Sequence, residues 1–327
     1  MDLSYGPEYE RFRNDVRTFI EGHRDQAPSG GEGLRSPKLI AWQKLLIEHG
    51  YTARTIPREY GGFGAEPDIL KSRIIAEEFV CSRVPGGLGG QGISMLVPTL
   101  LEMGTEEQKQ QFIPPTLRGD MIWCQGYSEP GAGSDLASLR TSAVLDGDEW
   151  VVNGQKIWTS TAHLADWIVC LVRTEPDAPK HKGISFLLFR MDTPGIEVRP
   201  LVDMTGQANF NEVFFTDVRV PKHQIVGQRG EGWLVANAIL GHERDSLGDP
   251  NATLTRLNAL IELMRTETVS GQRLIDHPLY RDRLMKLQGR AMAMRFNDLR
   301  ILSAKVNNSD ARLARMIVKL QGTELRH

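Results

Sequence analysis

With 327 residues, of which 40% are hydrophobic, the chain is long enough to bury a large core and to form two or three domains. Its formal net charge is −2 at pH 7 with both signs interspersed, so composition gives no reason to expect nucleic acid or a membrane surface as a partner. The three cysteines are widely spaced and odd in number, so no disulfide framework is implied and a reducing compartment is the simpler interpretation.

The N-terminus opens with acidic residues and lacks the basic stretch and apolar segment of a targeting signal. No apolar run approaches the ~20 residues that a membrane-spanning helix needs. We therefore expect a cytoplasmic protein without a transmembrane segment. The eight histidines show no metal-ligand spacing, so no metal site is expected.

Residues 7 to about 118 are predicted to form helices separated by loops that contain glycine and proline. The run from Thr105 to Gln108 is a capping-box pattern, which predicts that another helix begins there. The run from Gly87 to Gly92 fits Gly-x-Gly-x-x-Gly, but a dinucleotide-binding loop must follow a strand. Here the helix-like segment 77–80 precedes it, so we expect a loop that opens a helix.

From Met121 to Gly227 the chain is rich in Val, Ile, Phe and Trp, interrupted by glycine-containing turn pairs, which predicts a β-domain. Asp146-Gly147 and Asn153-Gly154 are flanked by β-prone residues. Such pairs predict tight hairpins, because both turn positions require positive φ. The segment is expected to be a small antiparallel sheet.

After Gly230 helical patterns return, over Trp233 to about Arg265, Pro278 to about Ser303, and Asp310 to the end. The predicted fold class is therefore α+β and multidomain. A helical domain is expected over residues 1–120, an antiparallel β-domain over 121–227 and a helical bundle over 228–327.

Two features stand out in the β-domain. In the loop from Ser128 to Asp135, glycines let the backbone turn tightly and approach a ligand. Ser134 fits either a helix cap or a ligand contact, and the two roles can coexist because helix N-termini favour anions. Farther along, Trp158 is followed by Thr159 and Ser160. This tryptophan fits either a core position or contact with a planar heteroaromatic cofactor.

Four motifs in the same order make the chain resemble the acyl-CoA dehydrogenase family over nearly its whole length. They are the Ser-Glu-Pro-Gly-Ala-Gly-Ser-Asp loop at 128–135, Asn-Gly-Gln-Lys-Ile-Trp-Thr-Ser at 153–160, the strand at 211–221, and the helical regions on either side. Within the family it is similar to the isovaleryl and long-chain branch and to members of steroid and lipid catabolism. The resemblance implies FAD against the middle domain and oxidation of an acyl-CoA, as in β-oxidation, to the 2,3-enoyl product.

The resemblance also assigns residues. Gln125, Tyr127 and Ser128 would edge the flavin, although Tyr127 departs from the smaller or aliphatic residue usual there. Gly133 would belong to the cofactor loop, and Ser134 would meet FAD or the CoA pantetheine. The run Trp158, Thr159 and Ser160 would face the flavin ring.

The expected base is Glu243, on the first helix after the β-domain, where one branch of the family carries its catalytic carboxylate. Removal of the proton beside a thioester carbonyl needs a positioned carboxylate whose pKa rises as substrate excludes water. Arg244 resembles the arginine that orients the CoA side. The alternative interpretation of Glu243 is a solvated helical charge.

The chain departs from the family in its C-terminal part. The stretch 267–271 lacks the arginine and phenylalanine with which a neighbouring subunit usually holds the FAD pyrophosphate, and the sequence stops before the last family helices. We expect a trimmed chain, a naturally short subunit, or one partner of a hetero-oligomer. Alternatives to an independent enzyme are a non-catalytic or site-completing subunit and a flavin oxidase or monooxygenase.

The resemblance implies an electron-transferring flavoprotein as electron acceptor and a homo- or hetero-oligomeric assembly. Five glycines between Gly86 and Gly92 lie near the presumed acyl end and suggest room for a long or polycyclic acyl group.

Overall fold

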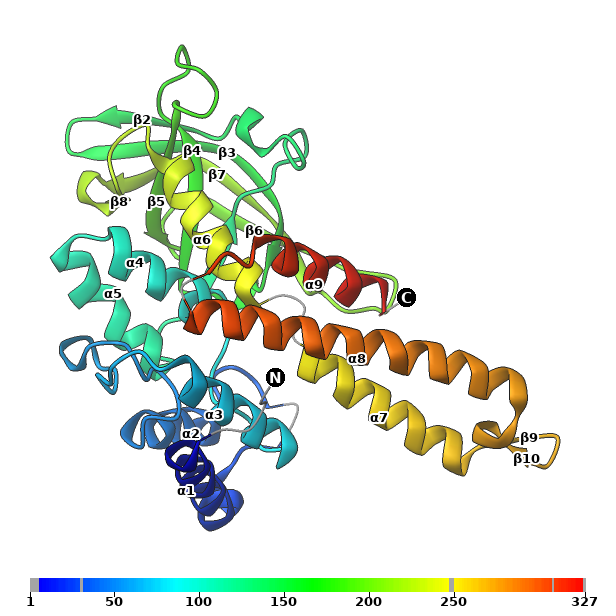
Figure 1. The fold of residues 1–327 in the computed structure, drawn as a ribbon. Helices are drawn as coiled ribbons and strands as arrows, with labels where there is room; N and C mark the ends of the chain where they lie inside the picture. The colour runs from blue at the N-terminus through cyan, green and yellow to red at the C-terminus, as the bar shows by residue number, and fades with distance from the viewer. Residues whose placement is uncertain (1–5, 30–31, 247–249, 308, 326–327) are drawn as a thin grey trace. The chain divides into compact units, whose positions relative to one another are not determined.

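The structure is a computed structural model that describes residues 6–29, 32–246, 250–307 and 309–325 (Figure 1). Helices precede and follow a β-sheet along the chain, so the predicted α+β fold class is confirmed. The division into domains at residues 120 and 227 stays a prediction. The described helices are α1 (Pro7–His23), α2 (Pro37–Glu48), α3 (Ile69–Cys81), α4 (Val97–Met103), α5 (Glu106–Arg118), α6 (Gly232–Ser246), α7 (Pro250–Thr266), α8 (Pro278–Val306) and α9 (Arg312–Glu324).

The chain divides into two compact units. The sheet unit consists of His23–Pro67 and Pro85–Glu243, and the helical unit of Met1–Gly22, Asp68–Val84 and Arg244–His327. Each unit has its own core of buried apolar side chains, so each is described separately.

The sheet unit is built on an eight-stranded sheet in the order β6-β7-β3-β2-β4-β5-β8, with β1 paired to β4. Its strands are β1 (Trp123–Gly126), β2 (Ser142–Asp146), β3 (Glu149–Ser160), β4 (Trp167–Arg173), β5 (Ile184–Arg190), β6 (Ile196–Leu201), β7 (Phe210–Pro221) and β8 (Ile225–Val226). Most pairs are antiparallel as predicted, but β1 and β4 run parallel and β2 meets β4 in parallel at one position.

Two apolar cores lie on opposite faces of this sheet. Trp123 and Tyr127 on one side of β1 join the core that also contains α4, α5 and α6 residues, among them Ile239. Cys124, between them in sequence, joins the second core with residues of β3 and β7. This alternation follows from the two-residue period of a strand. In Figure 1 the yellow helix α6 runs along the green sheet.

Only one of the two predicted hairpin turns is present. Asp146 pairs with Glu149, so the turn residues are Gly147 and Asp148, and of these only Gly147 has positive φ, at 62°. The prediction for Asn153-Gly154 is wrong, because this pair lies inside β3 at a register shift. A Cβ at Gly154 would stand 2.6 Å from Thr141 Oγ1, so the glycine serves close strand packing rather than a turn.

The helical predictions hold with one exception. The capping box of Thr105 and Gln108 starts α5 as predicted, with both reciprocal hydrogen bonds present. The glycine run follows helix α3 and leads into a π-helical turn, Gly92–Leu96, so it opens a helix as expected. The predicted helix from Trp233 to Arg265 is wrong as one element, because α6 ends at Ser246 and α7 begins at Pro250. Proline lacks the N–H that a helix interior requires and is favoured at a helix start.

The helical unit contains α1, α3 and the C-terminal helices. Leu257 and Met264 of α7 pack with Leu284 and Ala291 of α8. The stretch 267–271 contains β9 (Thr268–Val269) and the turn that joins it to β10 (Gln272–Arg273). Here Ser270 and Gly271 both have positive φ, so the segment that differs from the family is a tight hairpin.

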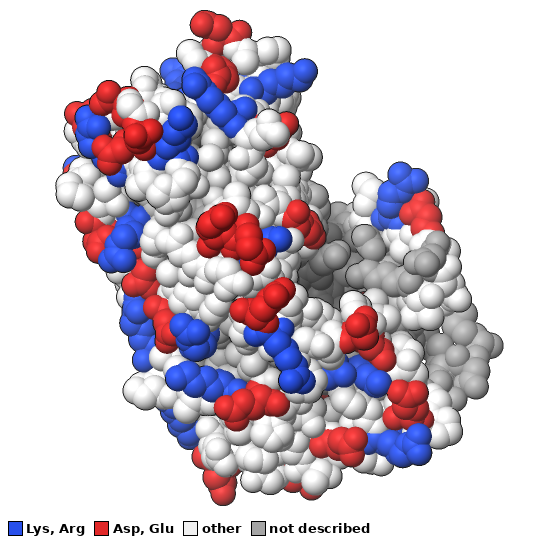
Figure 2. All heavy atoms as spheres, turned by 90° about the vertical axis from the view of Figure 1, so that its left-hand side faces the viewer, with Lys and Arg blue, Asp and Glu red and all other residues white. Residues whose placement is uncertain are grey.

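Acidic and basic side chains are interspersed on the face shown in Figure 2, which has no broad area of one sign. Among the described residues, every helix is too short or too polar to cross a membrane.

Candidate functional site at the sheet face

The predicted cofactor residues of β1 lie where the strand meets the helices of the sheet unit. The Gln125 side chain is half-buried, and its Oε1 accepts a hydrogen bond from Gln91 Nε2 at 3.4 Å. Tyr127 is only 7% exposed, and its ring stands edge-on to Phe186 with centroids 6.4 Å apart. The backbone oxygen of Ser128 accepts from Ile157 N at 2.9 Å, which ties the end of β1 to β3.

The loop after β1 is open to solvent at its tip. Gly133 and Ser134 are exposed, and a Cβ at Gly133 would meet no atom within 4 Å. Asp135, rather than Ser134, precedes the 3-10 turn Leu136–Ser138, and its carboxylate makes no capping hydrogen bond to the backbone. The helix-cap interpretation of Ser134 is therefore wrong, and its hydroxyl lies in a surface loop.

The end of β3 has an unusual backbone. The register with β7 shifts between Lys156 and Thr159, and Trp158 between them has a φ of 58°. Positive φ in a bulky residue is a strained conformation, and bulges redirect side chains. Trp158 is 61% exposed, with its ring edge-on to Phe210 at 6.1 Å, so it is not a core residue. Thr159 next to it is fully buried.

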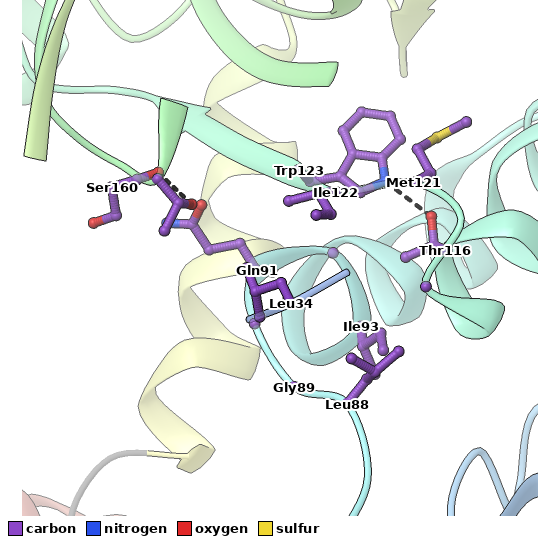
Figure 3. Close-up of a pocket in the computed structure, with 14 residues that line it drawn as sticks. Leu34, Leu88, Gly89, Gln91, Ile93, Thr116, Met121, Ile122, Trp123 and Ser160 are labelled. Carbon is purple, nitrogen blue, oxygen red and sulfur yellow. Dashed lines mark hydrogen bonds between the residues drawn. The ribbon is translucent and has the colours of Figure 1, made fainter. Parts of the chain in front are cut away.

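A cavity of about 570 Å³ opens beside these strands (Figure 3). Of the predicted site residues only Ser160 lines it. The wall is mostly apolar, and Trp123 is fixed in it by a hydrogen bond of 2.8 Å from Nε1 to Thr116 Oγ1. The lining residues are Leu34, Leu88, Gly89, Gly90, Gln91, Gly92, Ile93, Thr116, Gly119, Met121, Ile122, Trp123, Ser160 and Thr161. Sequence reasoning found the glycine run, in which Gln91 lies, but gave no role to Gln91 or to Trp123.

Three buried polar atoms near this sheet face have no hydrogen-bond partner among the described residues: Gln91 Oε1, Tyr127 Oη and Thr159 Oγ1. Buried polar groups are nearly always hydrogen-bonded in native proteins, so an unpaired one indicates a missing water or ligand. The resemblance assigns Tyr127 to the flavin edge and has Thr159 face the ring. The two hydroxyls and the amide oxygen therefore fit a ligand that offers hydrogen-bonding groups of its own.

Glu243 lies on α6, half-buried, one helical turn after Ile239 on the same helix face. Ile239 shares its core with Tyr127, which brings this face of α6 to the side of β1. Burial raises the pKa of Tyr127 above its ordinary value, the Gln125 side chain opposes the rise, and the negative charge of Glu243 adds to it. The side chain of Arg244 lies outside the described residues.

The structure thus brings together Gln125, Tyr127 and Glu243 at one sheet face, and Ser128 and Trp158 at the joined ends of β1 and β3. Gly133 and Ser134 stand apart on the exposed loop. Helices before and after a sheet, with a mostly apolar cavity and unpaired polar atoms beside the sheet, define an α+β protein with room for a ligand.

Comparison with known proteins identifies the family. The acyl-CoA dehydrogenase N-terminal domain matches residues 6–120, the middle domain matches 124–218 and the C-terminal domain matches 230–327. The chain is 40% identical over 300 residues to the acyl-CoA dehydrogenase IpdE1 of Mycobacterium tuberculosis, a match that covers 88% of this chain and 76% of that protein.

Two solved structures are similar. The Tcur3481-Tcur3483 steroid ACAD has a TM-score of 0.80 and 32% identity, with 99% of this chain and 83% of that chain covered. The ChsE4-ChsE5 complex from Mycobacterium tuberculosis has a TM-score of 0.78 at the same identity and coverage. This chain belongs to the acyl-CoA dehydrogenase family, which confirms the predicted class of enzyme, an oxidoreductase acting on acyl-CoA.

Proposed function

We propose that the chain uses FAD to convert an acyl-CoA to the 2,3-enoyl-CoA, with Glu243 as the base. The observation that carries the proposal is the place of Glu243 on the face of α6 that also carries Ile239, which shares its core with Tyr127, at a sheet face that also holds unpaired polar atoms. A half-buried carboxylate suits proton removal next to a thioester carbonyl, because a bound substrate would exclude water from it.

The residues for the cofactor come from three segments. Trp158 would face the flavin ring, since a large exposed aromatic side chain in a strained backbone needs a partner to cover it. Thr159 Oγ1 and Tyr127 Oη would form hydrogen bonds with the cofactor, in place of the partners that they lack within the described part of the chain. Gln125 and Ser128 would lie at the flavin edge, and Ser160 would face the ring. When bound, FAD supplies the acceptor for the β-hydride.

The CoA side of the site would use the exposed loop. Ser134 and Gly133 are accessible there, and an exposed loop can follow an extended pantetheine chain. Arg244 follows Glu243 in sequence and would orient the CoA moiety. Glu243 itself would hold its carboxylate toward the α-carbon and keep the abstracted proton.

The acyl group is proposed to be long or polycyclic. The cavity of about 570 Å³ is large enough for such a group, and its wall contains Leu88 and Ile93. Added Cβ atoms at Gly89 and Gly90 would meet no atom within 4 Å, so the glycine run leaves open space. One similar structure is named as a steroid enzyme, which agrees with a bulky substrate.

We propose an electron-transferring flavoprotein as electron acceptor and an oligomeric assembly. The helical unit exposes large apolar side chains on α8 and α9, which suits contact with another subunit. They include Met285, Met292, Phe296, Leu313, Met316, Ile317 and Leu320. A second candidate function, a subunit that completes the site of a different chain, is favoured by the two-component name of the ChsE4-ChsE5 complex.

The test is the visible spectrum of the purified protein, before and after anaerobic addition of acyl-CoA thioesters. Flavin absorption that bleaches is the expected result, and Glu243→Gln should retain the flavin and lose the bleaching. A colourless protein that gains activity only with a second chain would favour the site-completing subunit. Rapid oxygen consumption on turnover would instead indicate an oxidase. Full activity of Glu243→Gln would refute its role as the base.

A further inference from the structure

A buried ion pair lies directly behind the proposed cofactor residues. Lys156 on β3 is 0% exposed and Glu129, in the loop after β1, is 8% exposed. Lys156 Nζ donates to Glu129 Oε1 at 2.9 Å and to the backbone oxygen of Tyr127 at 3.1 Å. Burial of two charges is unfavourable unless their remaining hydrogen-bonding capacity is also used.

The carboxylate of Glu129 is fully engaged by the other end of the same loop. Its Oε2 accepts from Arg140 N at 2.7 Å and its Oε1 from Thr141 N at 2.9 Å. One side chain therefore joins residue 129 to residues 140 and 141 and closes the base of the loop. Burial opposes ionisation of Glu129, but the charge of Lys156 and these hydrogen bonds outweigh it and hold the pKa of Glu129 below its ordinary value.

The neighbouring chain is shaped to admit the lysine. A Cβ at Gly126 would stand 3.2 Å from Lys156 Cγ and 2.9 Å from Ile168 Cδ1, so the glycine leaves room for the lysine stem. The backbone bond from Ile157 N to Ser128 O runs beside the ammonium contacts. Trp158, two positions after Lys156 on the same strand, has the strained conformation with a φ of 58°.

We propose that Glu129 and Lys156 are a positioning pair, which acts through the loop and the β3 bulge to hold Tyr127, Ser128 and Trp158 in place for the cofactor. This inference rests on the proposed function. The pair touches neither substrate nor cofactor. Its effect is to fix the ends of the loop and the start of the bulge relative to each other, so that the cofactor need not order them on binding.

The test compares the FAD affinity of apoprotein variants by fluorescence titration. Lys156→Met leaves the buried carboxylate of Glu129 without its cation. In Glu129→Gln, the amide N–H₂ group replaces one carboxylate oxygen and therefore faces a donor instead of accepting a hydrogen bond from it. Each should weaken FAD binding by about tenfold or more. The control is Lys180→Met, which breaks an exposed pair with Asp135 on the same loop, with Nζ 2.7 Å from Oδ1. It should change the affinity by less than about twofold.

The double variant Lys156→Met/Glu129→Gln separates positioning from stability. It removes both buried charges and keeps a side-chain oxygen at position 129 that can accept from Arg140 N or Thr141 N, so it should be more stable than Lys156→Met. We expect the double variant still to bind FAD weakly, with faster hydrogen exchange over residues 130–141, because the lysine no longer joins β3 to the loop. Wild-type affinity in either single variant, or recovery of affinity with stability in the double variant, would overturn the proposal.

The wild type decides the underlying function in the same experiment. A wild-type apoprotein that takes up no FAD would remove the proposed function and this inference with it, whatever the variants do. A wild type that binds FAD while the single variants bind equally well would remove only the positioning pair.

Discussion

The unpaired hydroxyl of Tyr127 leads to a prediction with opposite signs for stability and binding. Oη is buried and, although the Gln125 side chain interacts with it, makes no hydrogen bond of standard geometry among the described residues, whereas the unfolded chain would hydrate it. An unsatisfied buried polar group costs ~1–3 kcal/mol, so Tyr127→Phe should stabilise the apoprotein by about that amount. The melting temperature should rise by roughly 2–4 °C per kcal/mol. If the hydroxyl serves the cofactor, the same change should weaken FAD binding by roughly 2- to 10-fold, the worth of one hydrogen bond.

Tyr60→Phe is the matched control. Tyr60 is also buried in this core, but its hydroxyl donates to Glu106 Oε1 at 3.0 Å and to Oε2 at 2.9 Å. Its loss should destabilise the apoprotein and leave FAD affinity unchanged. Thermal melts and FAD titrations of both variants test the contrast. A destabilised Tyr127→Phe apoprotein, or unchanged FAD binding, would refute the reasoning for this hydroxyl.

Three further predictions follow from single residues. Trp158→Ala should change the free energy of unfolding by less than about 0.5 kcal/mol because the side chain is exposed. The same change should lower FAD affinity by roughly 2- to 10-fold, because the aromatic contact with the cofactor is lost. An FAD affinity equal to that of the wild type would contradict this prediction. Gly92→Ala should cost ~1–3 kcal/mol in urea unfolding, because the added Cβ would stand 2.6 Å from Trp123 Cδ1. Gly89→Ala, with nothing within 4 Å, is its neutral control. The hydrogen bond to Glu106 raises the pKa of Tyr60 from 10.0 to about 12. The protonated Tyr60 hydroxyl therefore stabilises the folded state fully below pH 10, and this contribution is lost as pH rises toward 12. The melting temperature of the wild type should therefore converge on that of Tyr60→Phe over this range, and parallel curves would count against the assignment.

Local patterns predicted most of the architecture. The capping box at Thr105 set the start of α5 because its two hydrogen bonds are made within four residues. The Gly87–Gly92 run was assigned to a helix opening from the helical segment before it. The prediction for Asn153-Gly154 failed because the same pair is compatible with a hairpin turn and with a strand position where only glycine fits against a neighbouring segment. Only the position of Thr141 distinguishes the two.

The sequence by itself determined the order of helices and strands, the family, and which residues to consider at the site, because motifs and periodicity are properties of short segments. The tertiary structure decided how those residues are used. It left Trp158 exposed with positive φ, buried Tyr127 beside the α6 face that carries Glu243, and joined Lys156 to Glu129 across 27 residues of chain. Unpaired atoms, cavities and buried charges arise from contacts between distant segments, and no local pattern encodes them.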